Sequence, residues 1–221
     1  MSIEKKLAEI RKTLPEHVTL VAVSKTKPNS DLQEAYDAGQ RVFGENKVQE
    51  MTRKWEELPK DIQWHMIGHV QRNKVKYMAS FVSLIHGVDS LKLLKEINKQ
   101  GEKNNRKIPC LLQVHIAEEE TKFGFDENEL LELAQDQAFL QLENIEVQGL
   151  MGMATFTDDK NQVRKEFKIL HALFQKLKSN LDGLEILSMG MSGDYKIAIE
   201  EGSTMVRIGS SIFGARNYLQ S

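Results

Sequence analysis

Apolar residues along this chain fall into two patterns, short continuous runs and longer stretches with helical spacing. Residues 18–25 (VTLVAVSK) form an almost unbroken apolar run that stops on a lysine. A β-branched run of this length is typical of a strand buried on both faces of a parallel sheet. Before it, Ile3, Leu7, Ile10 and Leu14 recur at helical spacing among Glu and Lys residues. This spacing predicts an amphipathic N-terminal helix that ends before Pro15.

The same alternation continues to the end of the chain. Strands are expected over residues 18–25, 41–46, 62–68, 81–88, 108–116, 145–153 and 186–191, and from residue 205 to 208. Helices are expected from a Ser30 or Asp31 cap to Gly39, over 47–58, 71–79 and 161–177, from Leu91 onward, over 127–137 after an Asp126 cap, and over about 193–201. Eight alternating units without a long linker predict an α/β fold, a single (β/α)8 TIM barrel with an extra N-terminal helix. We expect residues 1–221 to form this one domain, and a doubly wound open sheet is the alternative.

Composition narrows the class of protein. The 221 residues are 40% hydrophobic and 28% charged, with a net charge of −2, which describes a globular protein without a basic field for nucleic acid. No run approaches the roughly 18 apolar residues of a membrane span, and the charged start lacks the apolar core of a leader. The single cysteine, Cys110, is expected to be a buried thiol, which favours a reducing compartment. We therefore expect a cytoplasmic protein, and a closed barrel without an obvious exposed apolar stripe is compatible with a monomer.

Small polar residues follow the last two predicted strands. Strand seven ends in SGD (residues 192–194), and strand eight is followed by GSS (residues 209–211). Phosphate sites of this barrel often lie between these two loops, and the start of a helix favours an anion. The sequence predicts that both clusters hold one phosphate. The alternative is that Ser192 or Asp194 only caps a short helix.

Lys25 is expected close to this phosphate site, because strands one and eight are neighbours when the barrel closes. Desolvation and nearby cations lower the pKa of a lysine ammonium, which frees the amine to form a Schiff base. Lys27 is the rival candidate, but its amine should reach water beside Pro28 and stay protonated. Two alternatives stay open: Lys25 only neutralises a sugar phosphate, or it is a solvated end of an apolar run.

Three histidines, His65, His69 and His86, raise the question of a metal site. Their spacing matches no zinc signature and no cysteine pair accompanies them, so we expect no metal. Core or hydrogen-bonded histidines are the expected alternative. The basic cluster at residues 72–76 has too few aromatic neighbours for a nucleic-acid site and is expected to be a solvated helix face.

Several ordered motifs at the strand ends resemble those of a known family. They are AVSKTKP (22–28), FGEN with VQE (43–50), WHMIGHVQRNK (64–74), HGVDS (86–90), MGMSGDY (189–195) and VRIGSSIFGAR (206–216). Together they resemble the YggS/PROSC family, the pyridoxal phosphate (PLP) homeostasis proteins, whose fold is related to the N-terminal barrel of alanine racemase. The resemblance covers essentially the whole chain.

The resemblance implies a set of cofactor contacts. They are a Schiff base between Lys25 and PLP, phosphate contacts from Ser192, Gly209 and Ser210, a contact of Arg207 with the pyridine nitrogen, and a contact of Asn46 near the ring hydroxyl. An arginine cannot readily accept a proton, so the ring nitrogen should stay unprotonated and PLP should be a weak electron sink. The alternative for Arg207 is a salt bridge at the strand end.

Two functions are compatible with this resemblance. One is a non-catalytic protein that holds PLP and helps regulate its supply, and the other is a racemase-like PLP enzyme that acts on amino acids. Racemisation needs an acid–base group on each face of the substrate carbon, and Lys25 can supply one. In alanine racemase the other comes from a partner subunit, and that enzyme also has a C-terminal β-domain for which a chain ending at Ser221 has no room. We therefore expect the non-catalytic function.

Overall fold

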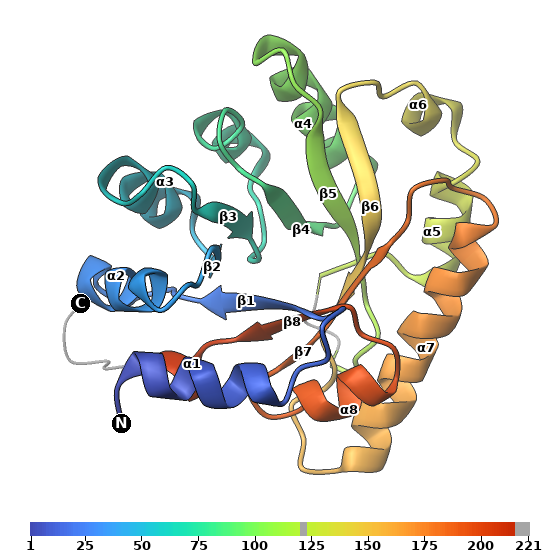
Figure 1. The fold of residues 1–221 in the computed structure, drawn as a ribbon. Coiled ribbons are helices and arrows are strands. Elements are labelled where there is room, and N and C mark those ends of the chain that lie inside the picture. The colour runs from blue at the N-terminus through green and yellow to red at the C-terminus, as the bar shows by residue number, and fades with distance from the viewer. Residues whose placement is uncertain (120–122, 215–221) are drawn as a thin grey trace.

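The computed structural model describes residues 1–119 and 123–214, and within them eight parallel strands close into a barrel (Figure 1). The strands are β1 (Thr19–Val23), β2 (Val42–Glu45), β3 (Gln63–Met66), β4 (Leu84–Val88), β5 (Ile108–Val114), β6 (Ile145–Gly152), β7 (Ile186–Met191) and β8 (Met205–Ile208). The barrel closes where β1 pairs with β8, from Thr19 opposite Met205 to Ala22 opposite Ile208. The predicted (β/α)8 barrel is confirmed, and the open-sheet alternative is wrong.

Helices surround the barrel on its outside (Figure 1). They are α1 (Ile3–Lys12), α2 (Asn29–Asp37), α3 (Val48–Glu57), the 3-10 helix η1 (Arg72–Tyr77), α4 (Leu91–Lys103), α5 (Glu127–Leu133), α6 (Gln137–Leu140), α7 (Lys160–Lys178), α8 (Tyr195–Glu200) and α9 (Ser210–Phe213). The extra helix α1 begins at Ser2, whose side chain caps it, and buries Leu7 and Ile10. None of the helices in the described ranges is long and apolar enough to cross a membrane.

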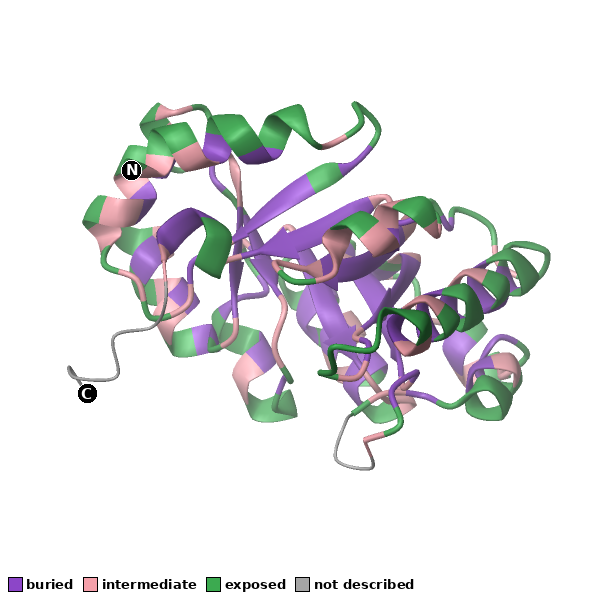
Figure 2. Cartoon of the chain, turned by 90° about the horizontal axis from the view of Figure 1, so that it is seen from below, coloured by how far each residue is buried: buried purple, intermediate pink, exposed green. Residues whose placement is uncertain are grey.

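Buried apolar side chains form two clusters, and most of the barrel strands are coloured as buried in Figure 2. Leu20 and Ala22 belong to the larger cluster, which includes the buried residues of the helices. Val21, between them, belongs to a small cluster with Leu84, Leu111, Met151 and Met205 from four other strands. Because side chains alternate between the faces of a strand, the small cluster fills the barrel interior. A packed interior leaves the open end of the barrel as the place for a site.

Cys110 of β5 is buried, as predicted. Burial raises the pKa of its thiol to about 12. The thiol is therefore protonated and unreactive at neutral pH.

Three helices differ from the sequence predictions. The segment 71–79 forms the 3-10 helix η1 rather than an α-helix. The segment 127–137 ends as α5 at Leu133, and Asp136 then caps a second helix, α6, by accepting a hydrogen bond from Ala138 N–H. Helix α2 begins after Pro28, which occupies the N-cap position instead of Ser30 or Asp31. The Asp136 cap accounts for the separate helix α6, and apolar spacing alone could not place the other boundaries.

Candidate functional site

A cavity of about 730 Å³ lies among the loops that follow β1, β2, β6, β7 and β8. All six residues proposed from the sequence line it, namely Lys25, Asn46, Ser192, Arg207, Gly209 and Ser210. They come from strand ends up to 185 residues apart, and barrel closure brings them together. Their contact with a ligand stays a prediction.

Lys25 lies two residues beyond the strand that was predicted to end on it. Strand β1 ends at Val23, and Ser24 N–H still donates to Gly44 O of β2 at 3.0 Å. Thr26 then takes a positive φ of 63°, which ends the extended backbone. Lys25 is half-buried and lines the cavity. A turn rather than the strand itself therefore sets the direction of its side chain.

Lys27 makes a contact that the sequence did not predict. Its Nζ donates to Phe213 O, at the end of α9, with a distance of 2.9 Å. The side chain is half-buried and also lines the cavity. Lys27 therefore connects the loop after β1 to the end of α9.

The loops after β7 and β8 are joined directly. Gly209 N–H donates to Ser192 Oγ, with a distance of 3.3 Å. Among the described residues no side-chain hydrogen bond caps the first turn of α8, and Asp194 Oδ1 instead accepts from Met191 N–H at 2.5 Å. The alternative that Ser192 or Asp194 only caps a helix is therefore wrong. The hydroxyl of Ser192 and the backbone around Gly209 share one wall of the cavity, as a site for a single phosphate requires.

Arg207 lines the cavity and is only 4% exposed. Its Nη1 donates to Ser188 O at 2.9 Å and to Ser188 Oγ at 2.6 Å, and its Nη2 donates to Gly152 O at 3.0 Å. Burial lowers the pKa of the guanidinium to about 10, and the nearby charge of Asp194 opposes that shift. Arg207 is thus a fixed cation at neutral pH, held by neutral oxygens rather than by the carboxylate that a strand-end salt bridge requires.

Two buried histidines extend this network across the barrel interior. His86 Nδ1 lies 3.1 Å from Ser188 Oγ, and His86 Nε2 lies 3.0 Å from His65 Nδ1. Burial lowers the pKa of His65 to about 3 and lowers the pKa of His86 well below its usual 6.5. Both rings are therefore neutral near pH 7. The prediction of hydrogen-bonded core histidines is confirmed for this pair.

His69 differs from the two core histidines. It is exposed, lies 3.0 Å from Asp89 Oδ2 and stacks on Phe123 with 4.0 Å between ring centroids. No group of three metal-ligating side chains occurs within residues 1–119 and 123–214.

Sequence reasoning missed two parts of the site. The first is the loop after β6, whose residues 153–158 line the cavity and whose Phe156 is 96% exposed. The polar sequence ATFTDD directly after a predicted strand was the available signal. The second is Ser188, which connects Arg207 to His86, and its alternation with apolar neighbours in β7 could have placed it inside the barrel.

Comparisons with known proteins agree with this architecture. Residues 1–217 match the family model described as alanine racemase, N-terminal domain. A pyridoxal phosphate homeostasis protein from Aquifex aeolicus is 43% identical over 201 residues, which covers 90% of this chain and 87% of the relative. A protein of the same name from Escherichia coli is 40% identical over 211 residues, covering 92% and 88%.

Two solved structures of a related protein have the same fold. PipY from Synechococcus elongatus is 36% identical, and the alignment covers 96% of this chain and all of PipY. The TM-score is 0.91 for PipY without PLP and 0.88 for PipY with PLP bound. The chain therefore belongs to the alanine racemase N-terminal domain family and, within it, to the family of pyridoxal phosphate homeostasis proteins.

Proposed function

We propose that this protein binds PLP in the cavity at the end of the barrel and holds it as a Schiff base on Lys25. The single observation that carries the proposal is that Lys25 shares one cavity with the hydrogen-bonded pair Ser192 and Gly209. An amine and a candidate anion site in one cavity suit a phosphorylated aldehyde. The structure of PipY with PLP bound, at 36% identity, supports the same ligand.

The residues of the cavity fit the parts of PLP. Ser192, Gly209 and Ser210 would hold the phosphate, Arg207 would face the pyridine nitrogen, and Asn46 would lie near the ring hydroxyl. A cavity of about 730 Å³ is within the usual size for a small-molecule site. In the attachment step the neutral amine of Lys25 adds to the aldehyde carbon, a C=N bond replaces the C=O bond, and the oxygen leaves as water. Bound PLP supplies an electron sink, which would be weak beside Arg207.

Reduction with borohydride followed by mass spectrometry tests the ligand and its attachment site together. The protein is incubated with PLP, reduced, digested and mapped. We expect one added pyridoxyl phosphate on the peptide that contains Lys25. A label confined to Lys27, or no label after incubation with PLP, would contradict the proposal. The absence of any label would favour a barrel that binds a phosphate without PLP.

We further propose that the protein acts as a cytoplasmic monomer that helps regulate the supply of PLP, without substantial catalysis. Arg207 is the supporting observation, because its pKa of about 10 leaves it a cation that withholds a proton from the ring nitrogen. The alternative is a racemase-like enzyme in which Lys25 is one of two acid–base groups.

Exchange of the α-proton separates the two functions. The PLP-loaded protein is incubated with single L-amino acids in deuterated water, and the α-proton signal is followed by NMR. We expect the α-proton signal to be lost no faster than it is with free PLP, because no strong electron sink stabilises the carbanion. Rapid loss of the signal, absent in a Lys25→Ala control, would establish the enzyme instead.

A further inference from the structure

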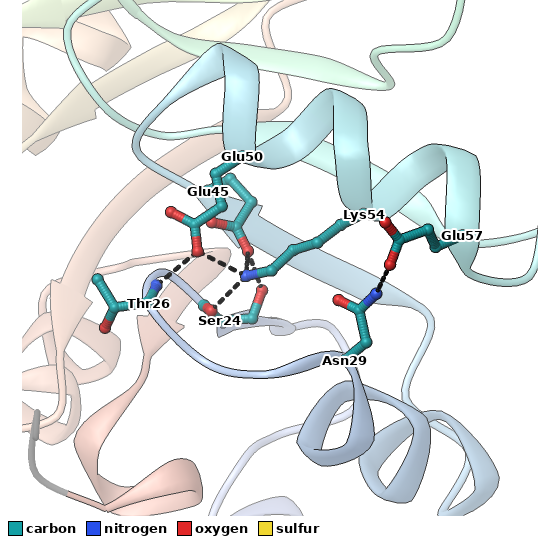
Figure 3. Close-up of polar contacts among 7 residues, drawn as sticks. All are labelled: Ser24, Thr26, Asn29, Glu45, Glu50, Lys54 and Glu57. Atoms are coloured by element: carbon teal, nitrogen blue, oxygen red, sulfur yellow. Dashed lines mark hydrogen bonds and ion pairs between the residues drawn. The ribbon is translucent and has the colours of Figure 1, made fainter. Parts of the chain in front are cut away.

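Three ionisable side chains form a buried cluster beside the turn that carries Lys25. Lys54 Nζ of α3 lies 2.7 Å from Glu45 Oε1 and 2.8 Å from Glu50 Oε1. The side chains of Lys54 and Glu45 are fully buried, and that of Glu50 is 16% exposed. Glu45 Oε1 also accepts a hydrogen bond from Ser24 Oγ at 2.6 Å. Figure 3 shows these side chains converging on the loop after β1 from β2 and α3.

The cluster holds both peptide groups that flank Lys25. Lys54 Nζ donates to Ser24 O at 2.8 Å, and Thr26 N–H donates to Glu50 Oε1 at 2.7 Å (Figure 3). The first bond fixes the peptide group before the Lys25 Cα, and the second fixes the peptide group after it. Because each peptide group is planar, fixing both determines φ and ψ of Lys25. These angles set the direction in which its side chain leaves the backbone.

Thr26 shows that this turn is held against a local preference. Its φ of 63° lies in the left-handed region, which is unfavourable for a β-branched residue. Such a conformation persists only where the surroundings enforce it. The hydrogen bond from Thr26 N–H to Glu50 is a contact that enforces it here.

The cluster itself lies outside the cavity. Lys25 lines the cavity, whereas Glu45, Glu50 and Lys54 are not among its described lining residues. A buried ion cluster also pays a large desolvation cost, and apolar replacements of similar size are often at least as stable. Stability alone therefore gives no reason for three charged groups at this place, but their bonds to the turn do.

We propose that Lys54, Glu45 and Glu50 are positioning residues for Lys25, which hold its backbone so that its amine points into the cavity. This inference rests on the proposed function, because it assumes that Lys25 is the attachment site. The three residues act only through Ser24 and Thr26 and touch no reacting atom. Loss of the Glu50 contact should therefore impair covalent attachment and leave binding of the phosphate and ring unchanged.

The test compares Glu50→Ala with the wild-type protein at equal PLP concentrations. We expect covalent attachment, followed by visible absorbance, to be about tenfold slower, as misplacement of a reacting group predicts. Affinity for 4-deoxypyridoxine 5'-phosphate, which lacks the aldehyde, should be unchanged. Without any ligand, hydrogen exchange at the Thr26 amide should be faster, because that amide loses its acceptor. Glu127→Ala, which breaks the exposed pair with Lys176, is the control and should alter none of these measurements.

Two further variants separate positioning from a general structural role. Glu50→Gln keeps an oxygen that can accept from Thr26 N–H, so it should lose less attachment rate than Glu50→Ala. It also serves as the test variant if Glu50→Ala does not fold. Adding Thr26→Asn to Glu50→Ala should restore part of the rate, because Asn adopts the left-handed region more readily than Thr.

The outcomes distinguish this inference from the proposed function. If the wild-type label lies on another lysine, both are overturned. If the label lies on Lys25 and neither Glu50 variant changes the attachment rate, only the positioning role is overturned. Equal losses of attachment and of 4-deoxypyridoxine 5'-phosphate affinity in Glu50→Ala would also overturn it, because they would show a collapsed site.

Discussion

Lys25→Ala should abolish covalent attachment of PLP, and with it the yellow colour of the reconstituted protein. Lys25 is the amine that we propose forms the C=N bond with PLP. Without its nitrogen this bond cannot form. The phosphate contacts proposed for Ser192 and Gly209 would come from the loops after β7 and β8, where these two residues are hydrogen-bonded to each other. We therefore expect 4-deoxypyridoxine 5'-phosphate to bind Lys25→Ala as it binds the wild-type protein.

The measurement is absorbance at the violet edge of the visible spectrum, followed by borohydride reduction and mass spectrometry. Lys27→Ala is the matched control, because Lys27 lines the same cavity but donates to Phe213 O. This control should still be labelled at Lys25, even if the altered contact with α9 changes its affinity. Full labelling of Lys25→Ala would mean that Lys27 or another lysine is the attachment site.

Much of the fold could be predicted from sequence because a buried parallel strand leaves a continuous apolar run. The apolar run at 186–191 begins and ends at the same residues as β7. Eight such runs predicted a barrel, and the strands do close into one. The short elements were less predictable. Helix α9 has only four residues, too few for an apolar spacing to identify it. The helix expected over 71–79 is present, but its 3-10 type and its shorter extent as η1 could not be predicted from apolar spacing.

Part of the cavity lining could be predicted from the sequence, but the loop after β6 was missed and the geometry could not be predicted. All six proposed residues line the cavity because strand ends of a barrel converge, which topology alone dictates. The partners of those residues depend on side-chain direction across the barrel, as with the bond from Arg207 to Ser188. The position of Lys25 depends on a turn whose φ angles leave little trace in sequence, since Thr26 is not a residue expected at positive φ.

Lys54→Met should strongly destabilise the protein, because it removes the cation from the buried cluster but keeps most of the side-chain volume. Removing one partner of a buried pair typically costs about 3–5 kcal/mol, because the other charge is left without compensation. For a chain of this size that loss corresponds to a fall in Tm of about 10 °C. The exposed-pair control Lys176→Met should lose no more than about 1 kcal/mol.

The loss in Lys54→Met should depend on pH in a defined direction. Burial raises the pKa of Glu45 in the wild-type protein, and the charge and hydrogen bond of Lys54 oppose that shift. Without Lys54 the pKa of Glu45 should rise further. A carboxyl whose pKa is raised by folding favours the folded state fully below its ordinary pKa of 4.5, and this contribution is lost as pH rises through the folded pKa. The difference in unfolding free energy between wild type and Lys54→Met should therefore be smaller near pH 5 than near pH 8.

Denaturant unfolding at a series of pH values measures this difference, and a second variant identifies its cause. Glu45→Gln added to Lys54→Met removes the fully buried one of the two carboxylates that lose Lys54, so it should restore part of the stability at pH 8 and flatten the pH dependence. A Lys54→Met protein as stable as Lys176→Met would show that the buried charges contribute nothing to the fold. A pH dependence of the difference that survives in the double variant would assign it to a group other than Glu45. The core histidines are the same in all of these proteins, so their lowered pKa values affect each stability alike and cancel in the difference.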